Sequence, residues 1–372
     1  GIWLYYAQLT TDTPWRARVY DGRMTLDTKI TQYWKQSRAK AIVSIQREGC
    51  WNGPEVYLPL TNANGSNVAM GLTVYNANDA VGTAPAKRVN TVDIAAGAIA
   101  GDLPADCRLE VLNNYNNARS LAALWVGMNY TDPDNFNHLL ECESAAGATP
   151  SADPASSGGY GAYASMAQNV ETTLFTWTLS AANLNAARGR FFHMMLRGAF
   201  APPHLAAYRL KLVYGGIDLM KSGQVWVQDE HAYGIRDLAT LRLPPWLPDQ
   251  ANSAALDLKL TGQQNIQPSY SVFYDCLYLM PADGWCAYSF DYPALDFNRR
   301  LVDDGINGVV YQDNGAGGLK LGVPQPAGDG LKLRPGLAHR LYFLTNSNQA
   351  STSEIDRTMV VRLAYRPRKA VL

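Results

Sequence analysis

Three acidic segments carry the side chains best suited to acid–base chemistry or metal binding. Asp132-Pro133-Asp134, Asp229-Glu230 and Asp303-Asp304-Gly305 each place two carboxylates close together. Such pairs can act as the acid and base of a glycoside hydrolase or as calcium ligands. Turns are the commoner use, because an Asp side chain bonds its own backbone and Gly accepts a positive φ. We expect turns and no catalytic residue; the cofactor left open is a structural calcium on Asp303 and Asp304.

Other catalytic patterns are missing from the sequence. It contains no GxSxG nucleophile elbow, and neither a P-loop nor GxGxxG in a strand-to-helix context. The histidines lack HxH or HExxH spacing, and the odd number of cysteines lacks a CxxC pair. We expect reduced, buried cysteines, ordinary packing for the histidines, and no enzymatic activity. These residues are His138, His193, His204, His231 and His339, and Cys50, Cys107, Cys142, Cys276 and Cys286.

Aromatic residues in expected loops suggest a different chemistry. Neutral carbohydrate is commonly bound by aromatic rings stacked on sugar faces, with amide side chains bonding the hydroxyls. The candidates are Trp51, Tyr115, Trp246 and Trp285, and each could equally be a core or interface aromatic. Trp125, Trp177 and Trp226 lie in expected strands and are assigned to the core.

The charge balance limits the partners. Lys plus Arg equals Asp plus Glu at 32 each, and charged residues make up only 17% of the chain. No overall field attracts nucleic acid or anionic lipid, and no apolar run approaches the roughly 20 residues that span a bilayer. We expect no nucleic acid and no membrane as partners, and instead protein surfaces, copies of this chain or a glycan.

Period-two alternation of apolar and polar residues recurs along the chain, as in Arg108–Leu112 and Leu256–Leu260. Alternation of this kind is typical of half-buried strands. Frequent punctuation by 31 Gly and 20 Pro fits short strands joined by turns. The expected fold class is all-β, with two tandem antiparallel jelly-roll-like β-sandwiches and an N-terminal arm. Two segments could be helical: Ala181–Arg188, which Ser180 could cap, and Ala80–Ile99, which glycine and proline interrupt. We expect one short helical turn, near Asn183.

Domain boundaries follow from composition. Residues 1–53, rich in aromatics, are expected to form an arm or extra strands that dock on a domain or a neighbouring subunit. Residues 54–180 would form the first sandwich, with an exposed low-complexity loop at 144–161, and residues 181–372 the second.

An ordered series of five strand-like segments recurs in the second half of the chain at offsets of about 135 to 152 residues. It pairs, for example, Arg108–Leu112 with Leu256–Leu260, and Leu121–Met128 with Phe273–Met280. A duplicated sandwich explains this order, and chance similarity among strands remains the alternative.

Three stretches resemble a known family: Arg47–Val56 leading into Leu58–Asn62, Phe175–Ser180, and Glu354–Arg357 leading into a strand that ends Tyr365–Arg368. They are similar to virion structural proteins of tailed phages and prophages, of the tail or baseplate kind, with tandem galactose-binding-like jelly rolls. The resemblance extends over most of the chain from about Ile42. It implies assembly into a virion or extracellular particle and brings no catalytic residues.

Three hypotheses follow. The first is a structural protein that self-assembles through its arm and strand edges with other virion proteins. The second is a carbohydrate- or receptor-binding module, which can coexist with the first. The third, a glycoside hydrolase or lyase, requires two carboxylates converging in a cleft.

Overall fold

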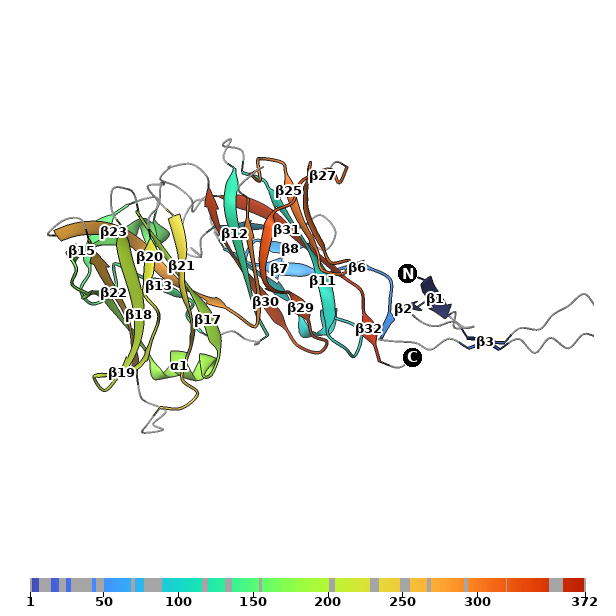
Figure 1. The fold of residues 1–372 in the computed structure, drawn as a ribbon, viewed down its shortest axis with the longest axis horizontal. Coiled ribbons are helices and arrows are strands. Elements are labelled where there is room, and N and C mark those ends of the chain that lie inside the picture. The colour runs from blue at the N-terminus through green and yellow to red at the C-terminus, as the bar shows by residue number, and fades with distance from the viewer. Residues whose placement is uncertain are drawn as a thin grey trace, which may run out of the picture.

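The computed structural model is built almost entirely of antiparallel β-strands (Figure 1). Among the described residues, the single α-helix has seven residues, and no helix is long and apolar enough to cross a membrane. The described residues are 2–6, 15–19, 25–27, 42–44, 50–67, 71–76, 89–115, 120–130, 136–153, 156–200, 205–227, 234–247, 255–265, 269–290, 294–318, 320–347 and 357–370.

Residues 136–281 form one sandwich, which we call the inserted sandwich. Its six-stranded sheet has the order β14 (Thr149–Ala152), β15 (Tyr160–Ala167), β23 (Ser269–Pro281), β17 (Phe191–Gly198), β21 (Gly234–Arg242), with β13 (Leu139–Glu141) also on β23. Its five-stranded sheet has the order β16 (Thr172–Leu179), β22 (Leu256–Gln264), β18 (Ala206–Tyr214), β19 (Ile217–Lys221), with β20 (Val225–Val227) also on β18.

The chain on both sides of this unit forms the outer sandwich. Its seven-stranded sheet has the order β28 (Gln325–Gly330), β24 (Gly284–Ser289), β12 (Leu121–Asn129), β30 (His339–Ser347), β10 (Thr91–Ile94), β7 (Leu60–Asn62), β8 (Gly65–Asn67). Its eight-stranded sheet has the order β27 (Lys320–Gly322), β26 (Val309–Asp313), β25 (Arg300–Asp304), β11 (Ala105–Asn113), β31 (Thr358–Tyr365), β6 (Val56–Tyr57), with β29 (Lys332–Leu333) on β11 and β9 (Leu72–Tyr75) on β31.

The all-β fold class of antiparallel sandwiches is confirmed, and both sandwiches have a jelly-roll strand order. In the inserted sandwich, β15-β23-β17-β21 lie side by side in one sheet and β16-β22-β18-β20 in the other. In the outer sandwich the equivalent orders are β9-β31-β11-β25 and β10-β30-β12-β24. Numbered along each sandwich, both use strands 1-8-3-6 and 2-7-4-5, the jelly-roll arrangement.

The expected domain boundaries need correction, because the two sandwiches are nested. Residues 54–180 and 181–372 each contain parts of both units. The outer sandwich closes when β12 pairs with β30, far along the chain, and the inserted sandwich occupies the connection between β12 and β24. Strand patterns reveal which residues are extended but not their partners, so the sequence did not reveal this insertion.

The proposed strand-by-strand repeat is wrong in its correspondence, although the two sandwiches share one topology. The alternating segment Arg108–Leu112 lies in β11, the third strand of the outer jelly roll. Its supposed match, Leu256–Leu260, lies in β22, the seventh strand of the inserted one. Similar half-buried strands occupy both halves of a jelly roll, so order and spacing alone matched non-equivalent positions.

Each sandwich has its own apolar core, and a third cluster joins them. The joining side chains come from β17, β21 and β23 on one side and β30 on the other. The four sheets therefore stack as layers in the order five-, six-, seven- and eight-stranded, with the six- and seven-stranded sheets in the middle. We call the contact between these two middle sheets the seam.

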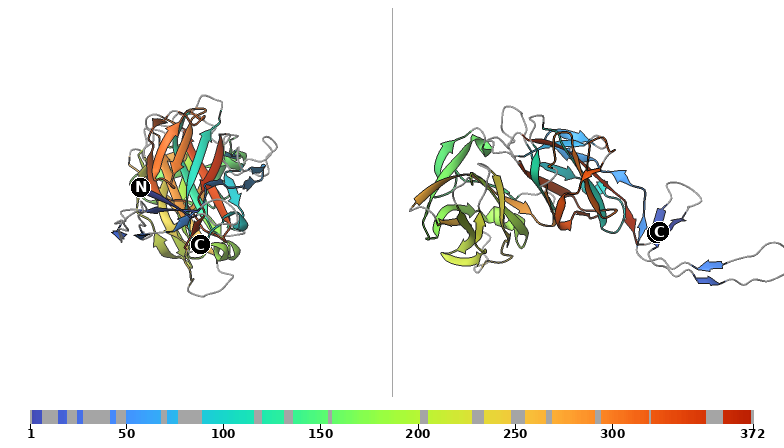
Figure 2. Two further views of the ribbon diagram at one scale, coloured as in Figure 1. Left: turned by 90° about the vertical axis from the view of Figure 1, so that its right-hand side faces the viewer. Right: turned by 45° about the horizontal axis from the view of Figure 1, so that its top comes forward.

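The expected arm contains β1 (Ile2–Tyr6), β2 (Trp15–Val19), β3 (Thr25–Asp27) and β4 (Ile42–Ser44). β1 and β2 join β5 (Trp51–Asn52) and β32 (Arg368–Lys369) in a four-stranded sheet, whereas β3 pairs with β4. These strands lie at the end of the outer sandwich remote from the inserted one (Figures 1 and 2).

Local predictions fared differently in two neighbouring segments. The helix α1 (Ala181–Ala187) is confirmed, and the Asn183 amide donates to Ser180 Oγ at 3.2 Å. The 144–161 segment is only partly a loop, because Thr149–Ala152 pairs with Tyr160–Tyr163 and Ser157 is buried. Its small residues carry no apolar alternation, so the strand pairing was not visible. Two short 3₁₀ turns, η1 (Ala96–Ala98) and η2 (Ser157–Gly159), complete the elements of the described part of the chain.

The seam and the candidate binding surfaces

The seam is apolar at its centre. Met195, Ile235, Tyr278, Met280, Tyr342 and Leu344 are each at most 4% exposed. The sheets approach closely at Gly127, where a Cβ atom would lie 2.6 Å from Met280 Cγ and from the Pro281 carbonyl oxygen. A side chain at this position would push the two sandwiches apart, so glycine is required by the close approach.

Polar side chains bridge the two sandwiches around this centre. The Asn346 side chain accepts from the Ile235 amide at 2.7 Å and donates to the Ile235 carbonyl at 2.9 Å. Arg197 Nη1 donates to the Asn76 carbonyl at 3.4 Å. These bonds satisfy buried groups and fix the relative position of the two sheets.

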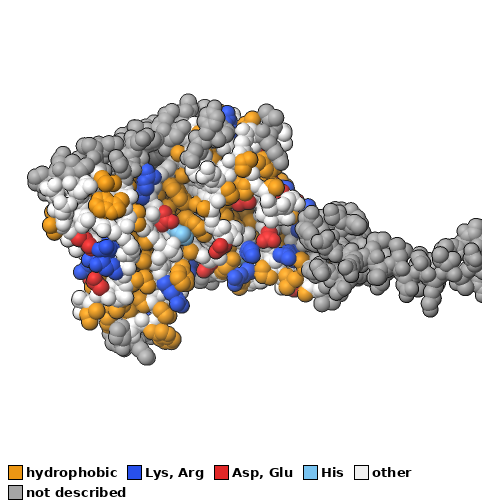
Figure 3. Space-filling model, in the orientation of Figure 1, with side chains coloured by type: hydrophobic (Ala, Val, Ile, Leu, Met, Phe, Trp, Pro, Cys, Tyr) orange, Lys and Arg blue, Asp and Glu red, His pale blue; other side chains and the backbone are white. Residues whose placement is uncertain are grey.

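The predicted ligand residue Trp285 lies at the seam and is engaged there. Its ring stacks on His193 with centroids 3.7 Å apart and planes 8° from parallel. His193 Nδ1 lies 2.8 Å from Asp237 Oδ2, so the imidazole bridges a carboxylate and an indole from different sandwiches. Figure 3 shows hydrophobic side chains reaching the surface across the middle of the molecule, beside charged ones.

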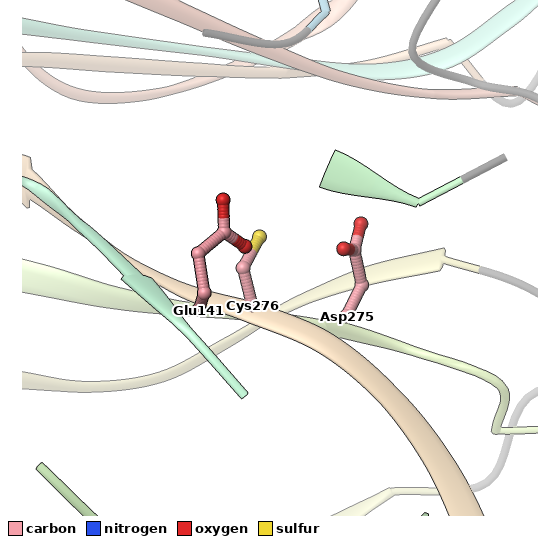
Figure 4. Close-up of side chains that lie close together, drawn as sticks. All are labelled: Glu141, Asp275 and Cys276. Atoms are coloured by element: carbon pink, nitrogen blue, oxygen red, sulfur yellow. The ribbon is translucent and has the colours of Figure 1, made fainter. Parts of the chain in front are cut away.

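A carboxyl cluster lies beside the seam, built by Glu141, Asp275 and Cys276. A bulge in β23 leaves Asp275 without a partner between the pairs Arg197↔Cys276 and Gly198↔Tyr274. The bulge breaks the usual alternation, so the adjacent Asp275 and Cys276 project to the same side as Glu141 (Figure 4). The ligand atoms of the three residues lie within 4.8 Å of one another.

Burial sets the charge state of this cluster. It raises the pKa of Glu141 to about 8; a 2.7 Å hydrogen bond from Ser157 Oγ opposes the rise, and the Asp275 carboxylate adds to it. Burial also raises the pKa of Asp275, to about 6. This rise is smaller than that of Glu141 because Arg197 Nε lies 3.2 Å from Asp275 Oδ2 and favours the ionised form. At neutral pH, Asp275 is therefore ionised beside Arg197 and Glu141 is largely protonated.

The cluster has the composition of a metal site, but its surroundings favour a structural role. The Arg197 guanidinium, itself 4% exposed, already provides the positive charge beside Asp275. The adjoining cavity has a volume of about 10 Å³, enough for one water molecule and not for a substrate. Burial also raises the pKa of the Cys276 thiol, which keeps it protonated. We assign neither a metal nor catalysis to these residues.

The expected calcium pair does not converge. Asp303 and Asp304 are neighbours on β25, whose alternation sends adjacent side chains to opposite faces. Asp303 Oδ2 accepts from the Tyr288 hydroxyl at 2.5 Å, and burial raises the pKa of Asp303. Asp304 Oδ2 accepts from Asn307 Nδ2 at 2.7 Å and closes the following turn. Turn formation, the commoner use of such a sequence, accounts for Asp304.

Trp246 is the aromatic candidate that the structure exposes most, with 75% of its surface accessible. It lines a depression of about 600 Å³ between β19 and the segment that follows β21. Hydrophobic side chains also gather at the lower end of the inserted sandwich in Figure 3. The other lining residues are Leu219, Met220, Arg242, Leu243, Pro244, Pro245 and Leu247.

The remaining aromatic candidates are dispersed. Trp51 is half-buried in β5, within the arm sheet. Tyr115 follows β11, and its ring lies 5.4 Å from the guanidinium carbon of the buried Arg357. With Trp285 at the seam, the four candidates form no common site. Trp226, assigned to the core from sequence, is 47% exposed on β20.

The other sequence candidates have mixed outcomes. All five cysteines are free and buried, as expected. The segments Asp132–Asp134 and Asp229–Glu230, with His204 and His231, lie outside the described residues. Sequence reasoning missed Glu141, Asp275 and Arg242. The sequence contained one signal for this cluster. Asp275 is an isolated charged residue in the apolar run Phe273–Met280, and a charged residue in a buried strand needs a buried partner.

Comparisons with known proteins give no family. No family model matches the chain, and no curated protein sequence matches it. Among solved structures, the chain is similar to a carbohydrate-binding module of the β-sandwich superfamily, with 13% identity, 76% of this chain and 96% of that chain covered, and a TM-score of 0.26. It is also similar to the VP2 subviral particle protein of infectious bursal disease virus, with 10% identity, 72% and 66% coverage and a TM-score of 0.21.

A structure of the Gt strain of the same virus shares 8% identity, with 98% and 84% coverage and a TM-score of 0.22. At this level of similarity, the neighbours carry no argument about function. The resemblance to tailed-phage proteins found in the sequence therefore stays a prediction.

Proposed function

We propose that this chain is a non-enzymatic structural subunit of a phage virion or phage-like particle, and that it self-assembles through its arm and strand edges. The observation that carries the proposal is the arm itself. Its strands lie beyond the outer sandwich, and β3 and β4 pair only with each other among the described residues (Figure 1). A two-stranded ribbon is marginally stable alone and gains by pairing with another chain.

The arm sheet links the two ends of the described chain. β2 pairs with β5 at Arg16↔Asn52, and β5 pairs with β32 at Arg368↔Asn52. β1 is the outermost strand on one side of this sheet and presents an edge for strand addition. On the other side, β32 is already covered, because the Arg368 carbonyl accepts from the amides of Asp102 and Leu103. An arm that pairs with β5 at its base, and whose β3–β4 ribbon pairs with no other described strand, suits a subunit that reaches a neighbour.

The test is the native mass of the purified chain by light scattering, followed by negative-stain imaging. We expect a defined oligomer for the full chain and a monomer after deletion of residues 1–49. The variant Leu26→Pro, which removes an amide donor from β3, should weaken the oligomer, and Leu26→Ala is the matched control. An oligomer that survives the deletion unchanged would refute the role of the arm.

A second function, carbohydrate or receptor binding, is favoured by Trp246 and the depression beside it. An indole with three quarters of its surface exposed is costly in water and offers a flat face for a sugar ring. Both functions can reside in one subunit. Isothermal titration calorimetry against a glycan panel tests this one, and no binding by wild-type protein across the panel would count against it.

A further inference from the structure

The Trp246 depression is held in shape by the residues on either side of the tryptophan. Leu243 and Leu247 are buried in the core of the inserted sandwich, at 0% and 3% exposure. Pro244 and Pro245 fix two backbone φ angles between these anchors and Trp246. The indole is therefore held outward by a short, restrained segment. A group held in place in this way binds a ligand at a lower entropic cost.

A cation lies in the same lining. Arg242, the last residue of β21, donates through Nε to the Gly189 carbonyl at 3.0 Å. Its guanidinium carbon lies 5.3 Å from the centre of the half-exposed Phe191 ring. Two contacts thus orient the guanidinium, and no carboxylate pairs with it among the described residues. An oriented arginine without an acidic partner is well suited to bind an anion in a bidentate manner.

The rest of the lining is apolar, from Leu219, Met220 and the two prolines. The volume of about 600 Å³ is within the range of small-ligand sites. A ligand that fits must present a ring face to the indole, an apolar surface to the walls and a negative charge to Arg242. A monosaccharide or disaccharide with a carboxylate combines these features.

We propose that the Trp246 depression binds an acidic saccharide, with one sugar ring stacked on Trp246 and its carboxylate paired with Arg242. This inference rests on the proposed carbohydrate-binding function and names its ligand class. Neutral sugars could stack on the same indole, but they leave the arginine without an anionic partner, so the acidic form binds more tightly.

The experiment is calorimetric titration of the full chain with trigalacturonate and with its methyl ester, in which an uncharged methyl ester replaces each carboxylate. A second pair, 3′-sialyllactose and lactose, tests another acidic sugar, which exceeds its neutral counterpart by one sialic acid residue. We expect at least about tenfold tighter binding of an acid than of its neutral counterpart, the factor expected for one charge-assisted hydrogen-bonded contact.

Variants locate the site. Trp246→Ala should abolish binding, and Arg242→Gln should remove the preference for the acid while leaving any binding of the neutral sugar. Arg242→Lys keeps the charge but loses the bidentate geometry and should show an intermediate preference. Trp226→Ala removes another exposed tryptophan of the same sandwich and should bind like wild type. Thermal unfolding of each variant checks that it is folded.

The outcomes separate the two proposals. Equal binding of acid and ester, lost in Trp246→Ala but unaffected in Arg242→Gln, overturns the acidic ligand class and keeps carbohydrate binding. Binding that survives Trp246→Ala overturns the location. Absence of binding to all four saccharides overturns this inference, and absence across the wider panel removes the carbohydrate-binding function as well.

Discussion

Two groups of buried charged residues in this protein consist of the same residue types, arginine and acidic side chains, but acids outnumber arginines in one group and arginines outnumber acids in the other. Beside the seam, one arginine, Arg197, faces two acidic side chains, Asp275 and Glu141. In the eight-stranded sheet, Arg300 bonds Asp313 through Nη2 at 2.6 Å and Glu110 through Nη1 at 2.9 Å. Two further arginines approach Glu110, namely Arg108 at 3.2 Å and Arg362 at 3.8 Å.

The difference shows how the number of cations decides what a buried acid does. The outer group surrounds its carboxylates with positive charge, and its arginines keep partial access to solvent. The seam group is short of one cation and lies deeper, so it is kept near neutrality by a proton on Glu141. We therefore expect the seam to be sensitive to pH and to loss of its arginine.

The largest expected effect follows removal of the two central arginines. Arg197→Met leaves Asp275 buried without its cation and should lower the free energy of unfolding by about 3 to 5 kcal/mol at pH 7. Arg300 is more accessible to solvent than Arg197, and its loss leaves Arg108 beside Glu110. Arg300→Met should therefore lower the free energy of unfolding by about 1 to 3 kcal/mol. Urea unfolding measures both. Equal losses would mean that charge balance does not distinguish the two groups.

The next effect is pH dependence. The folded chain raises the pKa of Glu141 from its ordinary value of 4.5 to about 8, so the native state holds an extra proton between these values. Stability from this group is therefore present below about pH 4.5 and is lost as the pH rises through 8. Asp275, with a pKa raised to about 6, adds a loss of the same sign at lower pH.

Glu141→Gln removes the part of this pH dependence that comes from Glu141 and leaves the part from Asp275. The variant should exceed wild type in free energy of unfolding by on the order of 3 kcal/mol at pH 9, with the difference shrinking toward pH 4. Glu143→Gln is the control. Burial also raises the pKa of Glu143, but this carboxyl is less buried than Glu141, so the variant should differ less from wild type in free energy of unfolding. A wild-type chain that grows more stable from pH 5 to pH 9 relative to Glu141→Gln would contradict the assignment.

A smaller effect is expected for the neutral part of the seam. Asn346→Ala removes both hydrogen bonds to Ile235 and should cost about 1 to 2 kcal/mol, independent of pH. The hydrogen-exchange rate of the Ile235 amide should increase in the same variant. Asn64→Ala, at an exposed turn of the outer sandwich, is the matched control. Unchanged protection at Ile235 would show that the seam does not depend on this bond.

The smallest effect is expected at the edge of the outer group. Arg362 is 34% exposed and lies 3.8 Å from Glu110, which already bonds Arg300. Arg362→Gln should therefore change the free energy of unfolding by less than about 0.5 kcal/mol. A loss comparable to that of Arg300→Met would show that all the arginines of this group are needed.

Local patterns were good guides to local structure. Alternation in Arg108–Leu112 and Leu256–Leu260 correctly indicated β11 and β22, and Ser180 correctly indicated the start of α1. The same patterns gave no guide to strand pairing. Trp125 on β12 pairs with Leu344 on β30, although the whole inserted sandwich lies between these two residues in the sequence. The exposed Trp246 was among the predicted ligand residues, but Arg242 was not, since its relation to Trp246 depends on how β21 ends against β19.

The sequence by itself determined the all-β class, the helix cap, the lack of CxxC pairs and the neutral charge balance, because these depend on composition or on residues a few positions apart. Tertiary structure decided the nesting of one sandwich in the other, the seam and the proton on Glu141. Strand partners are chosen by packing between distant segments, and a carboxyl pKa is set by the desolvation and charges that these segments bring together.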